Sequence, residues 1–139
     1  MSPAPQAQFL LFASGADWYA VPADRATEIV AVDSVTPIPG APPHVRGVFA
    51  HRGEVIPIID LLRLRSGAAG DASRAVIVRA ARGAYALTVT EVLGVGALGA
   101  ARSRLGEAGM LAHLSGPVRV QDRDVAVVDV EGLFGLLKG

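Results

Sequence analysis

The segment with the most familiar chemical spacing is Gly94-Val95-Gly96-Ala97-Leu98-Gly99, which matches the glycine pattern of dinucleotide-binding loops. In such a loop the glycines permit a tight turn and let the backbone approach a pyrophosphate at the start of a helix. The stretch that follows, 100–111, contains two more glycines, and no alternation of strands and helices surrounds it. We therefore interpret the match as chance in a chain with 16 glycines. A small nucleotide-binding enzyme stays open as the alternative from another functional class.

Two aspartates, Asp60 and Asp129, each follow an apolar stretch. Two carboxylates from symmetric halves could form an acid–base pair, but neither lies in an Asp-Thr-Gly or Asp-Ser-Gly turn. An aspartate after a strand can also cap a helix by accepting hydrogen bonds from its first free N–H groups. The sequence favours this structural role for both residues, with short helices from Leu61 and from Val130 onward.

The remaining polar residues form no catalytic or metal-binding set. The histidines are scattered without the spacing of metal ligands, and no serine lies in a G-x-S-x-G turn. The chain has no cysteine, which excludes disulfides, thiolate metal sites and cysteine nucleophiles. The sequence therefore predicts neither an enzyme nor a cofactor or metal site.

Arg52 stands at the tip of a predicted hairpin, in the segment 47–53. A turn arginine is most often simply solvated, and the residues alone favour that interpretation. The alternative is a guanidinium presented to a carboxylate, either Glu28 within the fold or one on a partner.

Short apolar runs separated by glycine- and proline-containing turns must position these residues. Such a pattern predicts an all-β fold, a barrel or a sandwich, and the proline-rich segment 36–43 is expected to be a stiff, extended loop. The predicted strands lie within 8–13, 18–21, 29–32, 45–49, 55–61, 75–78, 85–89, 91–95, 117–120 and 125–130. Several of these runs are apolar on both faces, which favours packing of one unit against another.

The chain also shows a faint internal repeat. Tyr19-Ala20-Val21 corresponds to Tyr85-Ala86-Leu87 at an offset of 66 residues (85 − 19), and Asp60 corresponds to Asp129 at an offset of 69 (129 − 60). We expect a single domain over 8–139 after a disordered tail, 1–7. Within it, two small barrels would lie mainly in 15–65 and 75–130, and exchange of terminal segments between them is left open.

Composition narrows the classes of function further. Apolar residues make up 51% of the chain and charged residues 19%, with a formal net charge of zero. These values exclude a disordered chain and disfavour a general nucleic-acid binder. No apolar run could span a membrane and no signal peptide begins the chain, so we expect a cytoplasmic protein with no direct membrane insertion. A chain this apolar, with so few charges, suggests that a partner covers part of its surface.

Several segments resemble the CheW-like domain family. The likeness is carried by 9–12, 18–22 and 28–30, then by Pro37-Ile38-Pro39-Gly40-Ala41-Pro42, Val45-Arg46-Gly47-Val48, Arg52-Gly53 and 55–61. It is strong over 8–64 and looser over 75–137. The resemblance implies two SH3-like five-stranded β-barrels packed together, with short helical segments, and no enzymatic activity.

The resemblance also implies a function and a set of residues. It implies a free-standing adaptor that couples the helical-hairpin tip of a chemoreceptor to the regulatory domain of a CheA-type histidine kinase within a receptor array. Other CheW-like proteins are further candidate partners. The implied receptor- or partner-binding residues are Glu28, Ile29, Val48, Arg52 and Gly53, and structural roles are implied for Pro39, Gly47, Asp60 and Asp129.

The chain departs from the family pattern at several places. His51 stands where leucine or isoleucine often precedes the Arg-Gly pair, and 121–124 replaces the usual glycine turn. Most departures fall in the second half, which makes kinase contact the less secure of the two interactions. An accessory adaptor that binds receptors or other coupling proteins, but not the kinase, is therefore the alternative.

Overall fold

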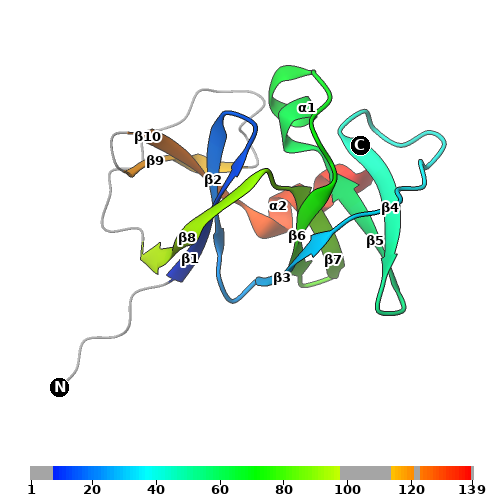
Figure 1. Ribbon diagram of the computed structural model, residues 1–139, viewed down its shortest axis with the longest axis horizontal. Coiled ribbons are helices and arrows are strands. Elements are labelled where there is room, and N and C mark those ends of the chain that lie inside the picture. Colours follow the sequence, from blue (N-terminus) through cyan, green and yellow to red (C-terminus); the bar gives the residue numbers. More distant parts are fainter. Residues whose placement is uncertain (1–7, 98–113, 121–122, 139) are drawn as a thin grey trace.

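The computed structural model describes residues 8–97, 114–120 and 123–138. Within these residues, ten strands form two five-stranded sheets, accompanied by short helices (Figure 1). The elements are β1 (Gln8–Ser14), β2 (Asp17–Pro22), β3 (Ala26–Ala31), β4 (Val45–His51), β5 (Glu54–Ile59), α1 (Leu61–Ser66), β6 (Arg74–Ala80), β7 (Gly83–Thr88), β8 (Glu91–Ala97), β9 (Leu114–Val120), β10 (Arg123–Val128), α2 (Val130–Gly135) and the 3-10 helix η1 (Leu136–Lys138). The predicted all-β class with short helical segments is confirmed. The expected tail, 1–7, lies outside the described residues.

The two sheets have the same pattern of strand pairing. The first sheet has the order β8-β1-β2-β10-β9, and the second has the order β3-β6-β7-β5-β4. In each sheet one pair is parallel, β2 with β10 and β7 with β5, and the other three pairs are antiparallel. Each position in one sheet therefore has a counterpart in the other.

The two halves of the chain exchange strands. The first sheet combines β1 and β2 with the last three strands, whereas the second combines β6 and β7 with β3, β4 and β5. The sheets therefore do not coincide with the expected halves, 15–65 and 75–130. After β2 the short segment 23–25 carries the chain across to the other sheet, where β3 pairs with β6.

The register of the parallel pairs supports the internal repeat. Ala20 lies opposite Val127 in the first sheet, and Ala86 lies opposite Ile58 in the second. These pairs reproduce both offsets of the sequence, 86 − 20 = 66 and 127 − 58 = 69. The repeated segments thus occupy equivalent places in the two sheets.

Both helices begin at the predicted aspartate caps. Asp60 Oδ1 accepts a hydrogen bond from the N–H of Arg63 at 3.1 Å, and Asp129 Oδ1 accepts one from the N–H of Gly132 at 3.0 Å. Asp60 is fully buried, and its Oδ2 also accepts from Arg46 Nη1. Each cap fixes the direction in which the chain leaves a parallel strand.

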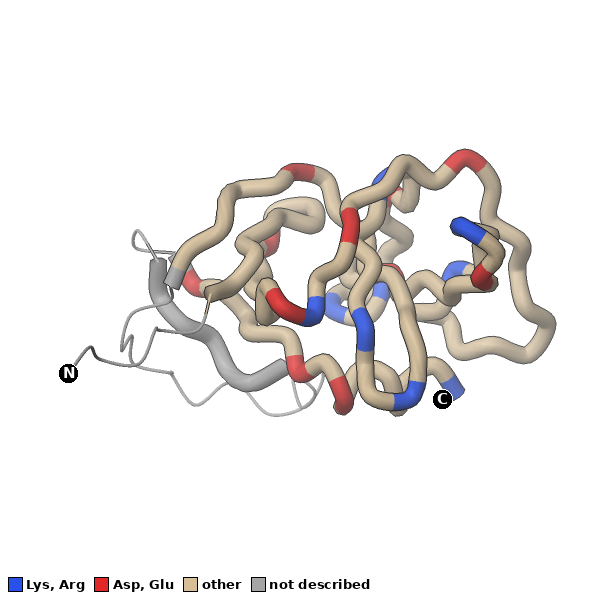
Figure 2. The backbone as a smooth tube through the Cα atoms, turned by 90° about the horizontal axis from the view of Figure 1, so that it is seen from below, with Lys and Arg blue, Asp and Glu red and all other residues tan. Residues whose placement is uncertain are grey.

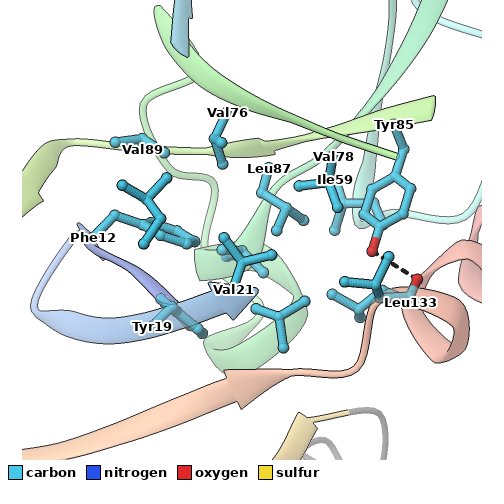
Figure 3. Close-up of a cluster of buried hydrophobic side chains, with 14 of the residues drawn as sticks. Phe12, Tyr19, Val21, Ile59, Val76, Val78, Tyr85, Leu87, Val89 and Leu133 are labelled. Atoms are coloured by element: carbon cyan, nitrogen blue, oxygen red, sulfur yellow. Dashed lines mark hydrogen bonds between the residues drawn. The ribbon is translucent and has the colours of Figure 1, made fainter. Parts of the chain in front are cut away.

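The main core lies between the two sheets (Figure 3). Phe12 and Tyr19 stack there with ring centroids 5.6 Å apart, and the Tyr85 hydroxyl donates a 2.8 Å hydrogen bond to the Val130 carbonyl, the dashed line in Figure 3. Burial, with a smaller contribution from the charge of Asp17, raises the pKa of Tyr19 to about 12. Burial also raises the pKa of Tyr85, so both tyrosines stay neutral in the core.

A second, smaller core lies on the opposite face of β6. Ala75 and Ile77 belong to this cluster, whereas Val76 and Val78 belong to the core between the sheets. Because side chains alternate along a strand, β6 is buried on both faces. This explains its unbroken apolar run, and it agrees with the prediction that such strands pack one unit against the other.

Candidate interaction site

The turn between β4 and β5 presents Arg52 to the surface. His51 and Glu54 form the last pair of the hairpin, so Arg52 and Gly53 make a two-residue loop, with φ of 49° and 81°. Positive φ at both positions is what a type I′ turn requires, and glycine meets this requirement without strain. Among the described residues, Arg52 is the one non-glycine residue with a positive φ. Its side chain is 76% exposed.

Glu28 on β3 binds two side chains of this hairpin. Arg52 Nη2 lies 3.0 Å from Glu28 Oε1, and His51 Nε2 lies 2.8 Å from Glu28 Oε2. The sequence left open two carboxylates for Arg52, Glu28 or one on a partner, and in the structure Arg52 pairs with Glu28. Since β3 and β4 are opposite edges of the second sheet, this contact shows that the sheet curls until its edges approach each other.

These contacts shift the acidity of Glu28. The hydrogen bond from His51, together with the charge of Arg52, holds the pKa of the Glu28 carboxyl below its ordinary value despite some desolvation. The carboxylate therefore stays ionised and available to both donors.

A second ion pair extends the cluster along the same hairpin. Arg79 on β6 binds Glu54 through Nη2 to Oε1 at 2.6 Å and through Nη1 to Oε2 at 3.4 Å. The hydrogen bonds and charge of Arg79 lower the pKa of Glu54, and those of Glu54 raise the pKa of Arg79. We call Glu28, His51, Arg52, Glu54 and Arg79 the charged cluster. Figure 2 shows where the other acidic and basic positions of the described residues lie along the backbone.

An apolar groove between the two sheets adjoins this cluster. Its lining comes from β1 and β8 of the first sheet, from β3 and β6 of the second and from the 23–25 segment, and its volume is about 210 Å³. Val95 and Ile29, which are 64% and 38% exposed, stand at its sides. The full lining is Leu10, Ala23, Ala26, Thr27, Glu28, Ile29, Val76 and Val95. Glu28 thus belongs both to the groove and to the charged cluster.

The structure brings together four of the five residues implied as partner-binding. Glu28 and Ile29 line the groove, and Arg52 and Gly53 form the adjacent turn. Val48 lies elsewhere, on the outer face of the β4–β5 hairpin opposite Pro57, and its N–H and C=O bind Thr36. The next pair on that face contains Val55, which is 69% exposed. Sequence reasoning missed the contact of His51, although His51 directly precedes Arg52.

Two of the residues with implied structural roles, Gly47 and Pro39, lie at backbone positions that favour their residue types. Gly47 has φ of 140°, and a Cβ there would lie 2.2 Å from the carbonyl oxygen of Thr36. Pro39 is the second residue of a turn that the Ala41 N–H closes onto the Ile38 carbonyl at 3.1 Å. Such a turn favours proline at that position.

The dinucleotide-binding alternative lacks the structural context it needs. Gly94 and Gly96 lie within β8 and pair with Leu11 and Phe9 of β1, so this part of the motif is strand rather than loop. Leu98 and Gly99 lie outside the described residues. Over 8–97, 114–120 and 123–138, no group of three or more potential metal ligands is present, and no helix is long and apolar enough to cross a membrane.

Comparison with known families gives a match over nearly the whole chain. The model of the CheW-like domain matches residues 8–138. The scaffolding protein TtCheW from Thermoanaerobacter tengcongensis has the same fold, with a TM-score of 0.80 over 95% of this chain and 90% of that one at 22% identity.

Two curated relatives are similar over shorter segments. Protein FrzA of Myxococcus xanthus is 39% identical over 62 residues, which are 45% of this chain and 39% of FrzA. Chemotaxis protein CheW of Treponema pallidum (strain Nichols) is 45% identical over 56 residues, 40% of this chain and 33% of that protein. The matched segments thus span about two fifths and one third of these relatives.

Proposed function

The chain belongs to the family of CheW-like domains, and from this premise we propose that it is a chemotaxis-type adaptor that couples chemoreceptor signalling tips to a CheA-type histidine kinase. The family is one of scaffolding proteins, which agrees with the prediction of a chain without enzymatic activity. The protein would act by stoichiometric binding and would cluster with receptors in the cytoplasm.

The observation that carries this proposal is the apolar groove with the charged cluster at its rim. A receptor tip is a helical hairpin, and an amphipathic helix binds a groove by placing apolar side chains into it. Ile29 and Val95 offer exposed apolar surface for such a helix. Arg52, 76% exposed, could bind a carboxylate beside those apolar contacts.

The test is binding to two purified partners, a chemoreceptor signalling fragment and the regulatory domain of a CheA-type kinase. We expect Arg52→Glu to weaken receptor binding about tenfold or more, because the reversed charge repels an acidic partner. Arg82→Glu is the matched control, since Arg82 is also an exposed arginine in the two-residue turn of a hairpin, between β6 and β7. The far-ultraviolet circular dichroism and melting temperature of both variants should stay close to those of the original protein.

Each outcome of this test has a definite meaning. Binding to both partners supports the coupling adaptor, and binding to the receptor alone selects the accessory adaptor. Binding to neither contradicts the proposal, and equal loss in Arg52→Glu and Arg82→Glu would remove Arg52 from the interface.

A further inference from the structure

The carboxylate of Glu28 is shared between two donors of different kinds. Its Oε1 faces Arg52 Nη2 at 3.0 Å, and its Oε2 faces His51 Nε2 at 2.8 Å. Neither oxygen serves both donors, so one contact can break while the other remains.

The two donors differ in how firmly they are held. The side chain of Arg52 is 76% exposed, whereas that of His51 is 24% exposed. The His51 ring also lies against Phe49, with centroids 6.4 Å apart at an angle of 53°. Arg52 is therefore the donor that can turn away toward a partner, and His51 is the one that stays with Glu28.

The short contact between His51 and Glu28 also identifies which nitrogen of the His51 ring carries the proton. Because an ionised carboxylate only accepts hydrogen bonds, Nε2 of His51 must carry a hydrogen at a separation of 2.8 Å. Neutral His51 thus leaves Nδ1 without a proton, and acidification adds a proton and a positive charge at that atom.

We propose that His51 is a positioning residue: it holds Glu28 while Arg52 exchanges this carboxylate for an acidic side chain of the partner, and protonation of His51 favours the exchange. When Arg52 leaves, Glu28 keeps one charge-assisted donor and is not left unpaired beside the groove. When His51 gains its charge, it compensates Glu28 more strongly and repels the neighbouring guanidinium.

The charges around His51 determine the sign of this effect. They are Glu28 on β3, Arg52 in the turn, Glu54 on β5 and Arg79 on β6, and they sum to zero. Protonation of His51 changes the sum for the charged cluster to +1. A positive cluster favours an acidic partner, so protonation of His51 should raise the affinity.

The first test uses the protein alone. The ¹⁵N signals of the His51 ring and of the Arg52 guanidinium are followed by nuclear magnetic resonance between about pH 8 and pH 5.5, the range of histidine titration. We expect the Arg52 signal to shift together with the protonation of His51, and to lose this shift in His51→Gln, which keeps a neutral donor. Arg25, paired with Glu131 at 2.9 Å, is the internal reference. An Arg52 signal that ignores His51 overturns the proposal.

The second test rests on the proposed function and uses the receptor signalling fragment. We expect the affinity of the original protein to rise about two- to fivefold from pH 8 to pH 6, the range of exposed charge pairs, and that of His51→Gln to stay constant. Identical pH profiles for the two proteins would overturn the proposal. If no fragment binds at any pH, the proposed function fails, and the signals of the free protein still decide the role of His51.

Discussion

At the scale of single residues, Glu28 shows how two ordinary contacts tune the pKa of a half-buried carboxylate. The largest cause of its lowered pKa is the hydrogen bond from His51, ahead of the charge of Arg52. The position of the imidazole therefore matters more to Glu28 than the nearby guanidinium does.

This order gives a prediction for the acidity of Glu28. We expect His51→Leu to raise the pKa of Glu28 toward its ordinary value by more than Arg52→Leu does. The measurement is a pH titration of the ¹³C signal of the Glu28 carboxyl in each variant. A larger shift in Arg52→Leu would contradict the stated order.

The sign of the linked stability follows from the same shift. Because the pKa of Glu28 is lower in the folded protein than in the unfolded chain, its contribution to stability is fully present at pH values above the pKa of the unfolded state. This contribution is lost as the pH falls through the lower pKa of the folded state. Acid should therefore separate β3 from the hairpin turn only when Glu28 itself becomes protonated.

Gly47 gives a prediction about stability that is independent of binding. We expect Gly47→Ala to destabilise the fold by about 3 kcal/mol, at the upper end of single substitutions. The new Cβ would lie 2.2 Å from the Thr36 carbonyl, which accepts a hydrogen bond from Val48. Gly53→Ala is the control, because Gly53 also has positive φ but no atom within 4 Å of a Cβ, and should cost about 1 kcal/mol. Urea denaturation gives both values, and equal losses would contradict the steric explanation.

The residues of the site could be predicted only in part. The turn at Arg52-Gly53 follows from local chemistry, and Glu28 was one of two carboxylates considered for Arg52. Neither the contact of His51 nor the pair of Glu54 with Arg79 could be read from the sequence. Those contacts depend on how far the second sheet curls, and no local pattern specifies that curvature.

At the scale of elements, the two helix-capping aspartates occupy equivalent places in the sequence but accept different numbers of hydrogen bonds. Asp129 accepts from Gly132, whereas the buried Asp60 accepts from Arg63, Gly70 and Arg46. Asp60 therefore ties α1 to the 67–70 loop and to β4 as well as beginning the helix.

This difference predicts unequal costs for the same substitution. We expect Asp129→Ala to destabilise the protein by about 1 kcal/mol, the usual cost of a lost cap. Asp60→Ala should cost about 3 kcal/mol, because it also removes the acceptor of the half-buried Gly70 N–H and Arg46 guanidinium. Chemical denaturation of both variants at one pH tests the comparison. Similar values would show that the extra donors find water instead.

The pairing of elements was the part of the fold that sequence reasoning could not provide. Apolar runs predicted the strands, and the two offsets predicted equivalent halves. An exchange between the halves was left open for the terminal segments alone, because a strand's pattern of apolar residues marks its buried face without naming its neighbour. In the structure β3 pairs with β6, and β8 pairs with β1.

At the scale of the whole molecule, the exchange of strands makes the apolar groove a product of both halves. The groove takes Leu10 and Val95 from the first sheet and Ile29 and Val76 from the second. Since each sheet also contains strands of both halves, the groove and the core between the sheets form together. An adaptor built this way presents its groove only when the entire domain is folded.

The exchange therefore predicts that neither half of the chain folds alone. Cleavage between Ala68 and Ala69, two exposed residues after α1, would leave β1 to β5 on one fragment and β6 to β10 on the other. Each fragment by itself would lack strands of both sheets, so we expect little β-sheet signal in circular dichroism and no cooperative thermal transition. Mixing the fragments should restore both signals in a 1:1 complex, because β3 can again pair with β6 and β8 with β1. The uncleaved chain is the control. A fragment that melts cooperatively on its own would contradict the exchanged arrangement, since it would require each half to close its own sheet.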